Sequence, residues 1–243
     1  MDLIRRHFTL IDSTNTWAKQ HAEELPFDKI TLVTADAQTA GRGRFKRQWE
    51  SPPNQNIYAS FCFFIKKRRP DIGNIPQILA LSCADILETL GFSPELKWPN
   101  DILLSKKKVA GILAETTSTE NGLCVVIGIG LNVNMPLDIL QRIDRPATSL
   151  AVERGCPFDV ETVLNLLANK FSVDLDVFLN QGFVPFLNPY KKRISEQENR
   201  AVRFHDNNIV WSGTIERIEN DGSLSLKLPD GSIKNFIVGE ILF

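Results

Sequence analysis

A β-hairpin pattern near the middle of the chain places the strongest restriction on the fold. The segments Ile102-Leu103-Leu104 and Lys108 to Glu115 are largely apolar, and Ser105-Lys106-Lys107 between them is a short polar turn. Two apolar segments joined by so few residues pair as antiparallel strands. At least part of the sheet is therefore predicted to be antiparallel.

Further strands and helices follow from the spacing of apolar residues. The strand candidates are rich in β-branched or aromatic residues and comprise Ile30 to Ala37, Ile57 to Ile65 and Leu123 to Asn134. The last of these is the best candidate for a central strand, because it is apolar and bounded by turn residues. The longer helix candidates have apolar residues at helical spacing and comprise Ile75 to Leu90 and Val160 to Leu179.

The composition changes near residue 195, where short alternating strand patterns replace the helical ones. Asn220-Asp221-Gly222 and Pro229-Asp230-Gly231 have the residues of tight hairpin turns. A β unit of roughly fifty residues is small enough to be a barrel attached to a larger domain. We therefore expect two domains, a larger one over residues 1–190 and a C-terminal β-barrel over residues 195–243.

Size and composition disfavour several classes of protein. The chain has 243 residues, of which 43% are hydrophobic, and a formal net charge of -1, which argues against broad attraction to nucleic acids or membranes. No signal peptide is visible, and the longest apolar run, Leu123 to Leu131, is too short to cross a bilayer. The four cysteines lie far apart, as is typical of buried thiols in a reducing compartment. These features predict a cytoplasmic protein.

The stretch from Gly41 to Trp49 combines two glycines with three arginines, Arg42, Arg44 and Arg47. Glycine lets the backbone turn sharply and approach a ligand closely. The arginine side chain offers a planar fork of donors that fits carboxylates and phosphates. The stretch is therefore predicted to be a mobile loop that folds over an anionic ligand.

Two other segments have the features of a ligand site. Ser13-Thr14-Asn15 begins a predicted helix, where one side chain is expected to cap the helix while others hold a polar ligand group. Gly128 and Gly130 interrupt an apolar strand without adding to its packing. They indicate the close approach of a ligand or of another backbone.

Charged residues after the Trp98-Pro99 corner suggest phosphate chemistry. Asp101 could hold a Mg²⁺ ion while arginine and lysine side chains neutralise the charge on a leaving pyrophosphate. Lys108 begins an apolar strand, where a charge without a function is less expected. We interpret Lys106-Lys107 as a solvated hairpin tip, and Lys66 to Pro70 as a solvated turn rather than a binding patch.

The glycine spacing disfavours two common classes of nucleotide-binding enzyme. Neither Gly41-Arg42-Gly43 nor Gly128-Ile129-Gly130 has the third glycine of a dinucleotide fingerprint, and neither ends in Gly-Lys-Ser/Thr. A Rossmann oxidoreductase and a P-loop nucleotidase are therefore disfavoured. The three histidines are scattered, so any metal is expected to be a hard cation held by oxygens.

Five short motifs contain the candidate site residues. In chain order they are Ser13-Thr14-Asn15, Gln38-Thr39-Ala40-Gly41-Arg42-Gly43-Arg44 with Arg47 and Trp49, Lys97-Trp98-Pro99-Asn100-Asp101, Lys108-Val109-Ala110-Gly111-Ile112-Leu113 and Gly128-Ile129-Gly130-Leu131-Asn132-Val133-Asn134. With these motifs in this order the chain resembles biotin protein ligases. Each motif alone is weak, but five in this order make coincidence improbable. Matching motifs cover residues 8–150, and a similar order of predicted elements continues the resemblance to the C-terminus.

The resemblance implies a fold and a two-step reaction. The fold is α+β, with a mixed, largely antiparallel sheet flanked by helices and a small C-terminal SH3-like β-barrel. In the reaction, the biotin carboxylate attacks the α-phosphate of ATP, with Mg²⁺, to give biotinyl-5'-AMP and pyrophosphate. A lysine of a biotin carboxyl carrier protein or domain then attacks the mixed anhydride and releases AMP. The arginine loop would shield this easily hydrolysed intermediate from water.

The resemblance also implies roles for individual residues. It implies biotin contacts for Ser13, Thr14, Asn15, Gln38, Gly41, Arg42, Gly43, Arg44, Lys108, Gly128 and Gly130. It implies contacts with ATP or the adenylate for Arg44, Arg47, Trp49, Asn100, Asp101, Lys108 and Asn132. Catalysis by positioning and charge stabilisation, without a protein nucleophile, is implied for Lys108, Arg42, Arg44 and Asp101. Asp101 is the implied ligand of Mg²⁺.

The resemblance bears on partners as well. Bifunctional members of the family carry a helix-turn-helix domain ahead of the ligase core, and Ser13 lies too near the N-terminus to leave room for one. We therefore expect a monofunctional ligase that binds no DNA and no membrane. A homodimer is allowed, because related ligases often pair through sheet edges. Lys46 stands where the family usually has glycine, so the loop is expected to close differently or to release more intermediate.

Two alternatives to this function are kept. A lipoate–protein ligase or lipoyl/octanoyl transferase resembles this family in fold, but its Arg-Arg…Gly-Gly-Gly signature and downstream His-Asp are absent here. A non-catalytic biotin- or nucleotide-binding regulator is the alternative from another class. Binding alone would not need Arg42, Arg44, Asp101 and Lys108 together.

Overall fold

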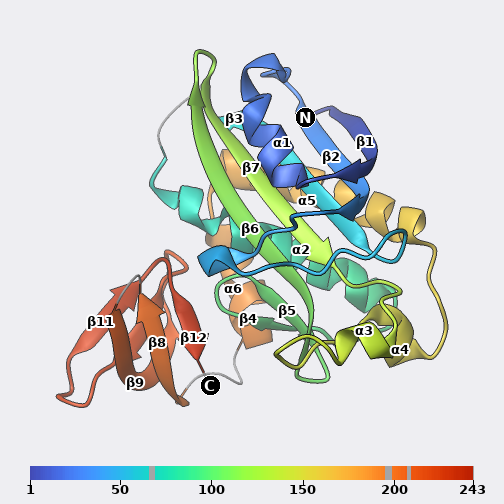
Figure 1. Ribbon diagram of the computed structural model, residues 1–243. Coiled ribbons are helices and arrows are strands. Elements are labelled where there is room, and N and C mark those ends of the chain that lie inside the picture. The colour runs from blue at the N-terminus through green and yellow to red at the C-terminus, as the bar shows by residue number, and fades with distance from the viewer. Residues whose placement is uncertain (66–68, 195–198, 207–208, 243) are drawn as a thin grey trace.

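The computed structural model of the chain describes residues 1–65, 69–194, 199–206 and 209–242. A large mixed sheet with helices on both faces lies beside a smaller antiparallel sheet (Figure 1). The predicted α+β class is therefore confirmed. No helix in these ranges is long and apolar enough to cross a membrane. The solvated turn predicted at residues 66–70 falls largely on residues 66–68, which lie outside these ranges.

Seven strands of the described residues form the large sheet, in the order β1-β2-β3-β7-β6-β5-β4. Their bounds are β1 Leu3–Ile11, β2 Ile30–Gln38, β3 Ile57–Ile65, β4 Glu95–Lys97, β5 Asp101–Leu104, β6 Lys107–Thr119 and β7 Gly122–Leu131. β1 pairs with β2 in parallel, and the other neighbours pair antiparallel. The predicted hairpin is β5–β6. The predicted central strand, β7, is indeed central, although it ends before Asn134.

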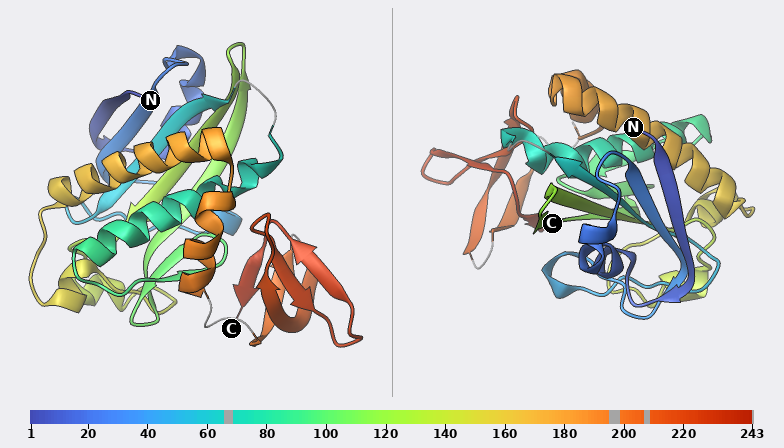
Figure 2. Two further views of the ribbon diagram at one scale, coloured as in Figure 1. Left: turned by 180° about the vertical axis from the view of Figure 1, so that it is seen from behind. Right: turned by 90° about the horizontal axis from the view of Figure 1, so that it is seen from above.

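Helices cover both faces of the large sheet, as Figure 2 shows from behind and from above. Their bounds are α1 Thr14–Gln20, α2 Ile75–Thr89, α3 Leu137–Leu140, α4 Leu150–Arg154, α5 Val160–Gln181 and α6 Val184–Ile194, with short 3-10 turns at η1 Ala22–Glu24, η2 Arg44–Lys46 and η3 Pro70–Asn74. On the face of α2 and α5, Phe61 of β3 packs against Phe171, with ring centroids 4.7 Å apart. On the opposite face, α1 covers Cys62 and Val126. β3 is consequently buried along its whole length, which explains its continuous apolar sequence.

The C-terminal sheet contains five strands in the order β11-β10-β9-β8-β12. Their bounds are β8 Ala201–Asp206, β9 Ile209–Ile218, β10 Leu224–Lys227, β11 Ile233–Phe236 and β12 Glu240–Leu242. All described pairings within it are antiparallel, as the alternating pattern predicts. The helix that precedes it, α6, was not predicted and continues to Ile194, past the expected domain end at residue 190. The division into two domains remains a prediction.

One hairpin turn of the small sheet is docked into the large domain. The carbonyl oxygen of Gly222 accepts hydrogen bonds from Gln77 Nε2 at 2.8 Å and from Trp98 Nε1 at 3.1 Å. Asn74 Nδ2 donates to the carbonyl oxygen of Asp221 at 2.8 Å. Gln77 and Trp98 are almost fully buried, so these bonds join the small sheet to the corner that precedes Asp101.

Replacing Gly222 by alanine should weaken this docking. The residue has a φ of +80°, and an added Cβ would lie 2.3 Å from Asn74 Nδ2. Gly231 is a matched control, because its φ is +84° and no heavy atom lies within 4 Å of its Cβ position. Left-handed backbone costs a non-glycine residue roughly 1–2 kcal/mol in either variant. We expect Gly222→Ala to lose about 1 kcal/mol more, since buried hydrogen bonds are strained.

Urea unfolding of both variants measures this difference in the free energy of unfolding. Equal losses for Gly222→Ala and Gly231→Ala would show that the docked turn does not stabilise the protein.

Candidate active site

One cavity brings the predicted site residues together. It has a volume of about 430 Å³, a typical size for a small-molecule site, and lies beneath the loop of residues 41–49, which we call the lid. Figure 1 shows the lid, with its η2 turn, crossing in front of β6 and β7. Every predicted site residue except Gly41 lines the cavity. These residues come from α1, the ends of β2 and β5, the lid, β6 and β7.

The end of the cavity beside α1 is a buried polar network. Gln38 Oε1 accepts from the backbone nitrogen of Thr14 at 2.9 Å, and Ser60 Oγ lies 2.8 Å from Thr14 Oγ1. Ser60 Oγ is also 2.6 Å from Asn15 Oδ1, and Asn15 Nδ2 donates to the carbonyl oxygen of Leu113 at 3.1 Å. Ser13 precedes the helix but makes no capping hydrogen bond with its side chain. These contacts fix the orientation of the polar groups before any ligand enters.

The two glycines of β7 seat side chains of the site. A Cβ at Gly128 would lie 2.2 Å from Asn15 Oδ1, and one at Gly130 would lie 2.3 Å from Cε2 of Trp49. The sequence predicted a close approach at both positions but not the atoms that make it. The Trp49 ring also lies 3.1 Å from the Cβ position of Gly111, so β6 and β7 together form its seat.

The lid is folded as a small hairpin. Trp49 N donates to the carbonyl oxygen of Gly41 at 2.9 Å, and Gly43 N donates to that of Arg47 at 2.8 Å. Phe45 at its tip has a φ of 55°, in the left-handed region. A Cβ at Gly41 would lie 2.6 Å from the carbonyl oxygen of Trp49, so only glycine fits where the two lid strands meet. The backbone of Lys46 belongs to the η2 turn, and its side chain lies outside the described part of the structure.

An ion pair also lines the cavity. Lys108 Nζ is 2.6 Å from Asp101 Oδ1, and the two side chains are only 18% and 20% exposed. Lys108 Nζ also lies 5.5 Å from the centroid of the Trp49 ring. The backbone of Lys108 is held on the other side, because its nitrogen donates to the carbonyl oxygen of Pro146 at 2.9 Å. A half-buried ammonium group is thus fixed between the lid tryptophan and a carboxylate.

Two lid arginines contact the C-terminal sheet. Arg44 Nη1 donates to Asn100 Oδ1 at 3.1 Å and to the carbonyl oxygen of Gly239 at 2.8 Å. Burial lowers the pKa of Arg44, against the opposing effect of the nearby Asp101 carboxylate. Arg47 forms an ion pair with Glu240. The lid is therefore connected to β12 as well as to the large sheet.

Several residues that line the cavity were not predicted as site residues. They include Tyr58, Lys97, Met135, the segment of residues 142–145, Ala147 and Glu240. Lys97 stands within the Lys97-Trp98-Pro99-Asn100-Asp101 motif, which could have identified it. Burial lowers the pKa of its ammonium group, while the charges of Asp101 and Glu240 oppose that shift. Glu240 has no local sequence signal, because it meets Arg47 only through the fold.

The predicted magnesium ligand is a single carboxylate. Among the residues that the structure describes, no group of three or more His, Cys, Asp or Glu side chains is placed to hold a metal ion. Asp101 would therefore need further oxygens from substrate phosphates, which is a common way for proteins to bind Mg²⁺. Because its carboxylate faces Lys108, the ion would share Asp101 with that ammonium group. The residues fit a Mg²⁺ ion that is also bound by substrate phosphates, and the Mg²⁺ site stays a prediction.

Comparisons with known proteins agree with this geometry. The model of the "Biotin/lipoate A/B protein ligase family" matches residues 7–132, and that of the "Biotin protein ligase C terminal domain" matches residues 199–243. The biotin--[acetyl-CoA-carboxylase] ligase of Paracoccus denitrificans is 32% identical over 240 residues, which cover 90% of this chain and 92% of the relative. The bifunctional ligase/repressor BirA of Escherichia coli (strain K12) is 30% identical over 238 residues, covering 96% of this chain and 71% of the relative.

A solved structure has the same architecture. The biotin protein ligase from Aquifex aeolicus in complex with biotin and ATP superposes with a TM-score of 0.82 at 28% identity, covering 99% of this chain and 97% of that one. The resemblance noted from the five sequence motifs is thus confirmed. With one family model matching more than half of its length, this chain belongs to the biotin/lipoate A/B protein ligase family.

Proposed function

We propose that the protein is an ATP-dependent biotin–protein ligase. It forms biotinyl-5'-AMP from biotin and ATP and transfers the biotinyl group to a lysine of a biotin carboxyl carrier protein or domain. One observation carries the proposal: a buried polar network and a fixed ammonium group line one cavity, beneath an arginine-bearing lid. The names of its relatives in Paracoccus denitrificans and Aquifex aeolicus support it.

The polar end of the cavity suits the ring system of biotin. That ring carries a cyclic urea, which is uncharged and has both hydrogen-bond donors and an acceptor. Thr14, Asn15, Gln38 and Ser60 offer donors and acceptors on rigid elements, and all line the cavity or contact its lining directly. Ser13 and Gly43 also line the cavity and are further proposed biotin contacts, and Gly128 and Gly130 leave room for the side chains of Asn15 and Trp49.

The cationic end suits the first chemical step. A carboxylate oxygen of biotin forms a bond to the α-phosphorus of ATP while the bond to the leaving pyrophosphate oxygen breaks. Negative charge develops on the phosphate oxygens as this happens, and fixed cations stabilise it without reorganising. Lys108 and Arg44 are the proposed cations, since both are held in place by Asp101 and Asn100 respectively. The proposed Mg²⁺ would supply further charge neutralisation at Asp101.

The nucleotide contacts have independent support. Asn132 is 2% exposed and donates through Nδ2 to the carbonyl oxygen of Thr148, but its buried Oδ1 has no hydrogen-bond partner in the described residues. An unsatisfied buried acceptor costs roughly 1–3 kcal/mol, so a donor from a ligand would be strongly favoured there. An exocyclic amine such as that of adenine is such a donor. We assign Trp49, Arg47 and Asn100 to the same nucleotide site.

The second step needs a lysine from another protein. Its uncharged amine attacks the carbonyl carbon of the mixed anhydride, the bond to the phosphate oxygen breaks, and AMP leaves. The carrier protein, pairing of two copies of the chain and cytoplasmic location belong to this proposal. So does the division of the chain into a catalytic domain of residues 1–190 and a C-terminal module of residues 195–243.

Pyrophosphate exchange into ATP tests the proposal. We expect exchange that depends on biotin, and transfer of labelled biotin to a purified carrier domain when the domain is added. Exchange with lipoate in place of biotin would identify the alternative ligase. Tight binding of biotin without any exchange would identify a non-catalytic regulator, and either result would overturn the proposal.

A further inference from the structure

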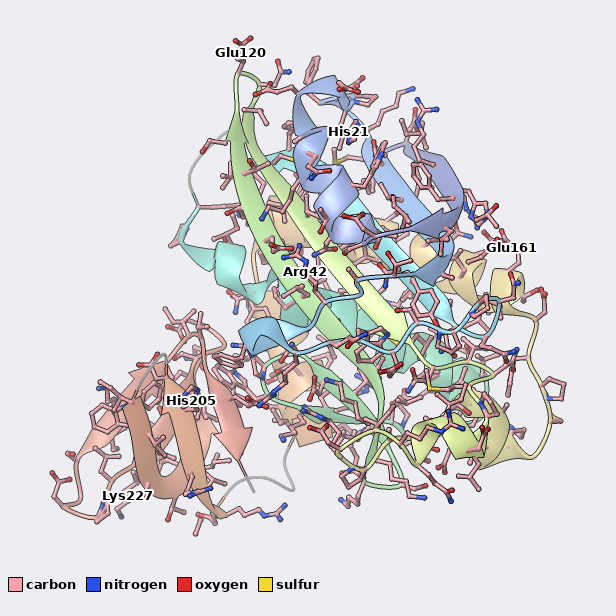
Figure 3. The ribbon with its side chains drawn as sticks, in the orientation of Figure 1. His21, Arg42, Glu120, Glu161, His205 and Lys227 are labelled. Carbon is pink, nitrogen blue, oxygen red and sulfur yellow. The ribbon has the colours of Figure 1, made fainter. Side chains whose placement is uncertain are left out.

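The first arginine of the lid does not share the surroundings of the second. Arg42 Nη2 lies 2.8 Å from Oε2 of Glu115, a residue of β6 that the sequence did not single out. Figure 3 shows Arg42 at the junction of the lid with α1 and β6. Arg44, by contrast, reaches Asn100 and the C-terminal sheet. The two arginines therefore face different ends of the site.

Glu115 is the centre of a polar cluster. Its Oε2 also accepts from Asn15 Nδ2 at 3.1 Å, and its Oε1 accepts from Lys19 Nζ at 2.8 Å. Its side chain is 17% exposed, whereas that of Arg42 is 42% exposed. Burial opposes ionisation of Glu115, but the hydrogen bonds from Lys19 and Asn15 and the Arg42 charge outweigh it and lower its pKa. A charged carboxylate thus joins three elements, α1, β6 and the lid.

The cluster is continuous with the polar end of the cavity. The Asn15 amide that donates to Glu115 also places its Oδ1 2.6 Å from Ser60 Oγ, within the network that we assign to biotin. A change in Glu115 therefore acts both on the lid, through Arg42, and on this wall of the cavity, through Asn15. No part of the adenylation chemistry proposed above requires Glu115 itself.

We propose that Glu115 is a positioning residue whose ion pair with Arg42 latches the lid over the acyl-adenylate. The inference rests on the proposed function for the identity of the shielded intermediate, and on the contacts alone for the latch. It assigns Arg42 to holding the loop closed instead of gripping biotin or phosphate. The mixed anhydride escapes or meets water only when the lid opens, so the latch slows its loss.

Hydrogen exchange of the unliganded protein tests the latch independently of any activity. Arg42→Gln and Glu115→Gln should each raise the exchange rates of the Gly43 and Trp49 amides, which the lid hairpin protects. A rise of about two- to fivefold is expected, because a partly exposed ion pair has a modest strength. Amides of β7 should not change. Lys19→Gln is the matched control, since it removes another partner of Glu115 without touching the lid.

Release of labelled acyl-adenylate, without carrier, tests the consequence. Both single variants should release it about two- to fivefold faster, and the double variant no faster than the singles, because the two residues act as one pair. Additive effects, or unchanged lid exchange, would overturn the latch. So would a hundredfold loss of pyrophosphate exchange in Arg42→Gln that Glu115→Gln does not share, because Arg42 would then act on the substrate. If no adenylate forms in the unaltered protein, the proposed function fails while the hydrogen-exchange result still decides the latch.

Discussion

Replacing Lys108 by alanine should lower the rate of biotin-dependent pyrophosphate exchange by about 10²–10³-fold. The loss corresponds to about 2.7–4 kcal/mol of transition-state stabilisation, the effect of removing one preorganised donor from a site of developing negative charge. Lys108 has this character because its side chain is only 18% exposed and its Nζ is held 2.6 Å from Asp101 Oδ1. The backbone hydrogen bond of Lys108 to Pro146 does not depend on the side chain, so β6 should keep its path.

Two variants separate catalysis from folding in this experiment. Lys107→Ala is the matched control, because Lys107 is the exposed neighbour of Lys108 on the same strand. This variant should show the normal rate of pyrophosphate exchange. Lys108→Ala leaves Asp101 without its partner in a side-chain environment only 20% exposed, so the free energy of unfolding of the variant is measured beside its exchange rate. Normal exchange in a folded Lys108→Ala protein would contradict its place in the site. Recovery of exchange in Asp101→Asn/Lys108→Ala would show that Lys108 merely neutralises Asp101.

Local patterns were sufficient to predict the elements that build the core. β3 and α2 have continuous or helically spaced apolar residues, and both are found where the sequence predicts them. β1 was missed because its residues are half-buried or exposed along its whole length, so no alternation marks it. α6 was missed for another reason, since Pro189 inside it weakens the helical pattern. The parallel pairing of β1 with β2 depends on the fold and has no local signal.

The site was predicted as a set of residues but not as a set of contacts. Glycine in a strand indicates close approach, yet only the fold reveals that Asn15 and Trp49 are the side chains that approach. Arginines in the lid predicted an anionic partner, and two of them meet Glu115 and Glu240 in the protein itself. Glu240 is separated from Arg47 by almost the whole chain, a distance over which single-sequence patterns carry no information. The assignments to substrate remain predictions for this reason.

Gly128 is a residue predicted from the sequence that also sets a contact of the site, because its missing side chain determines where Asn15 lies. An added Cβ would be 2.2 Å from Asn15 Oδ1 and 3.0 Å from Asn15 Cγ, far closer than packed atoms allow. Asn15 has little freedom to retreat, since it is 3% exposed and bonded to the Leu113 carbonyl oxygen and Glu115. Gly128→Ala must therefore displace the amide group from the polar end of the cavity.

We expect Gly128→Ala to lower kcat/KM for biotin in adenylation by about 100-fold, because misplacing a site group by about 1 Å has effects of that size. Asn15→Ala, which loses one hydrogen-bonding side chain, should lose about tenfold. In the double variant the new methyl group meets no amide, so activity should equal that of Asn15→Ala alone. If Gly128→Ala instead causes its full loss in the absence of the Asn15 side chain, the methyl group blocks biotin directly, and Gly128 does not serve as the seat of Asn15.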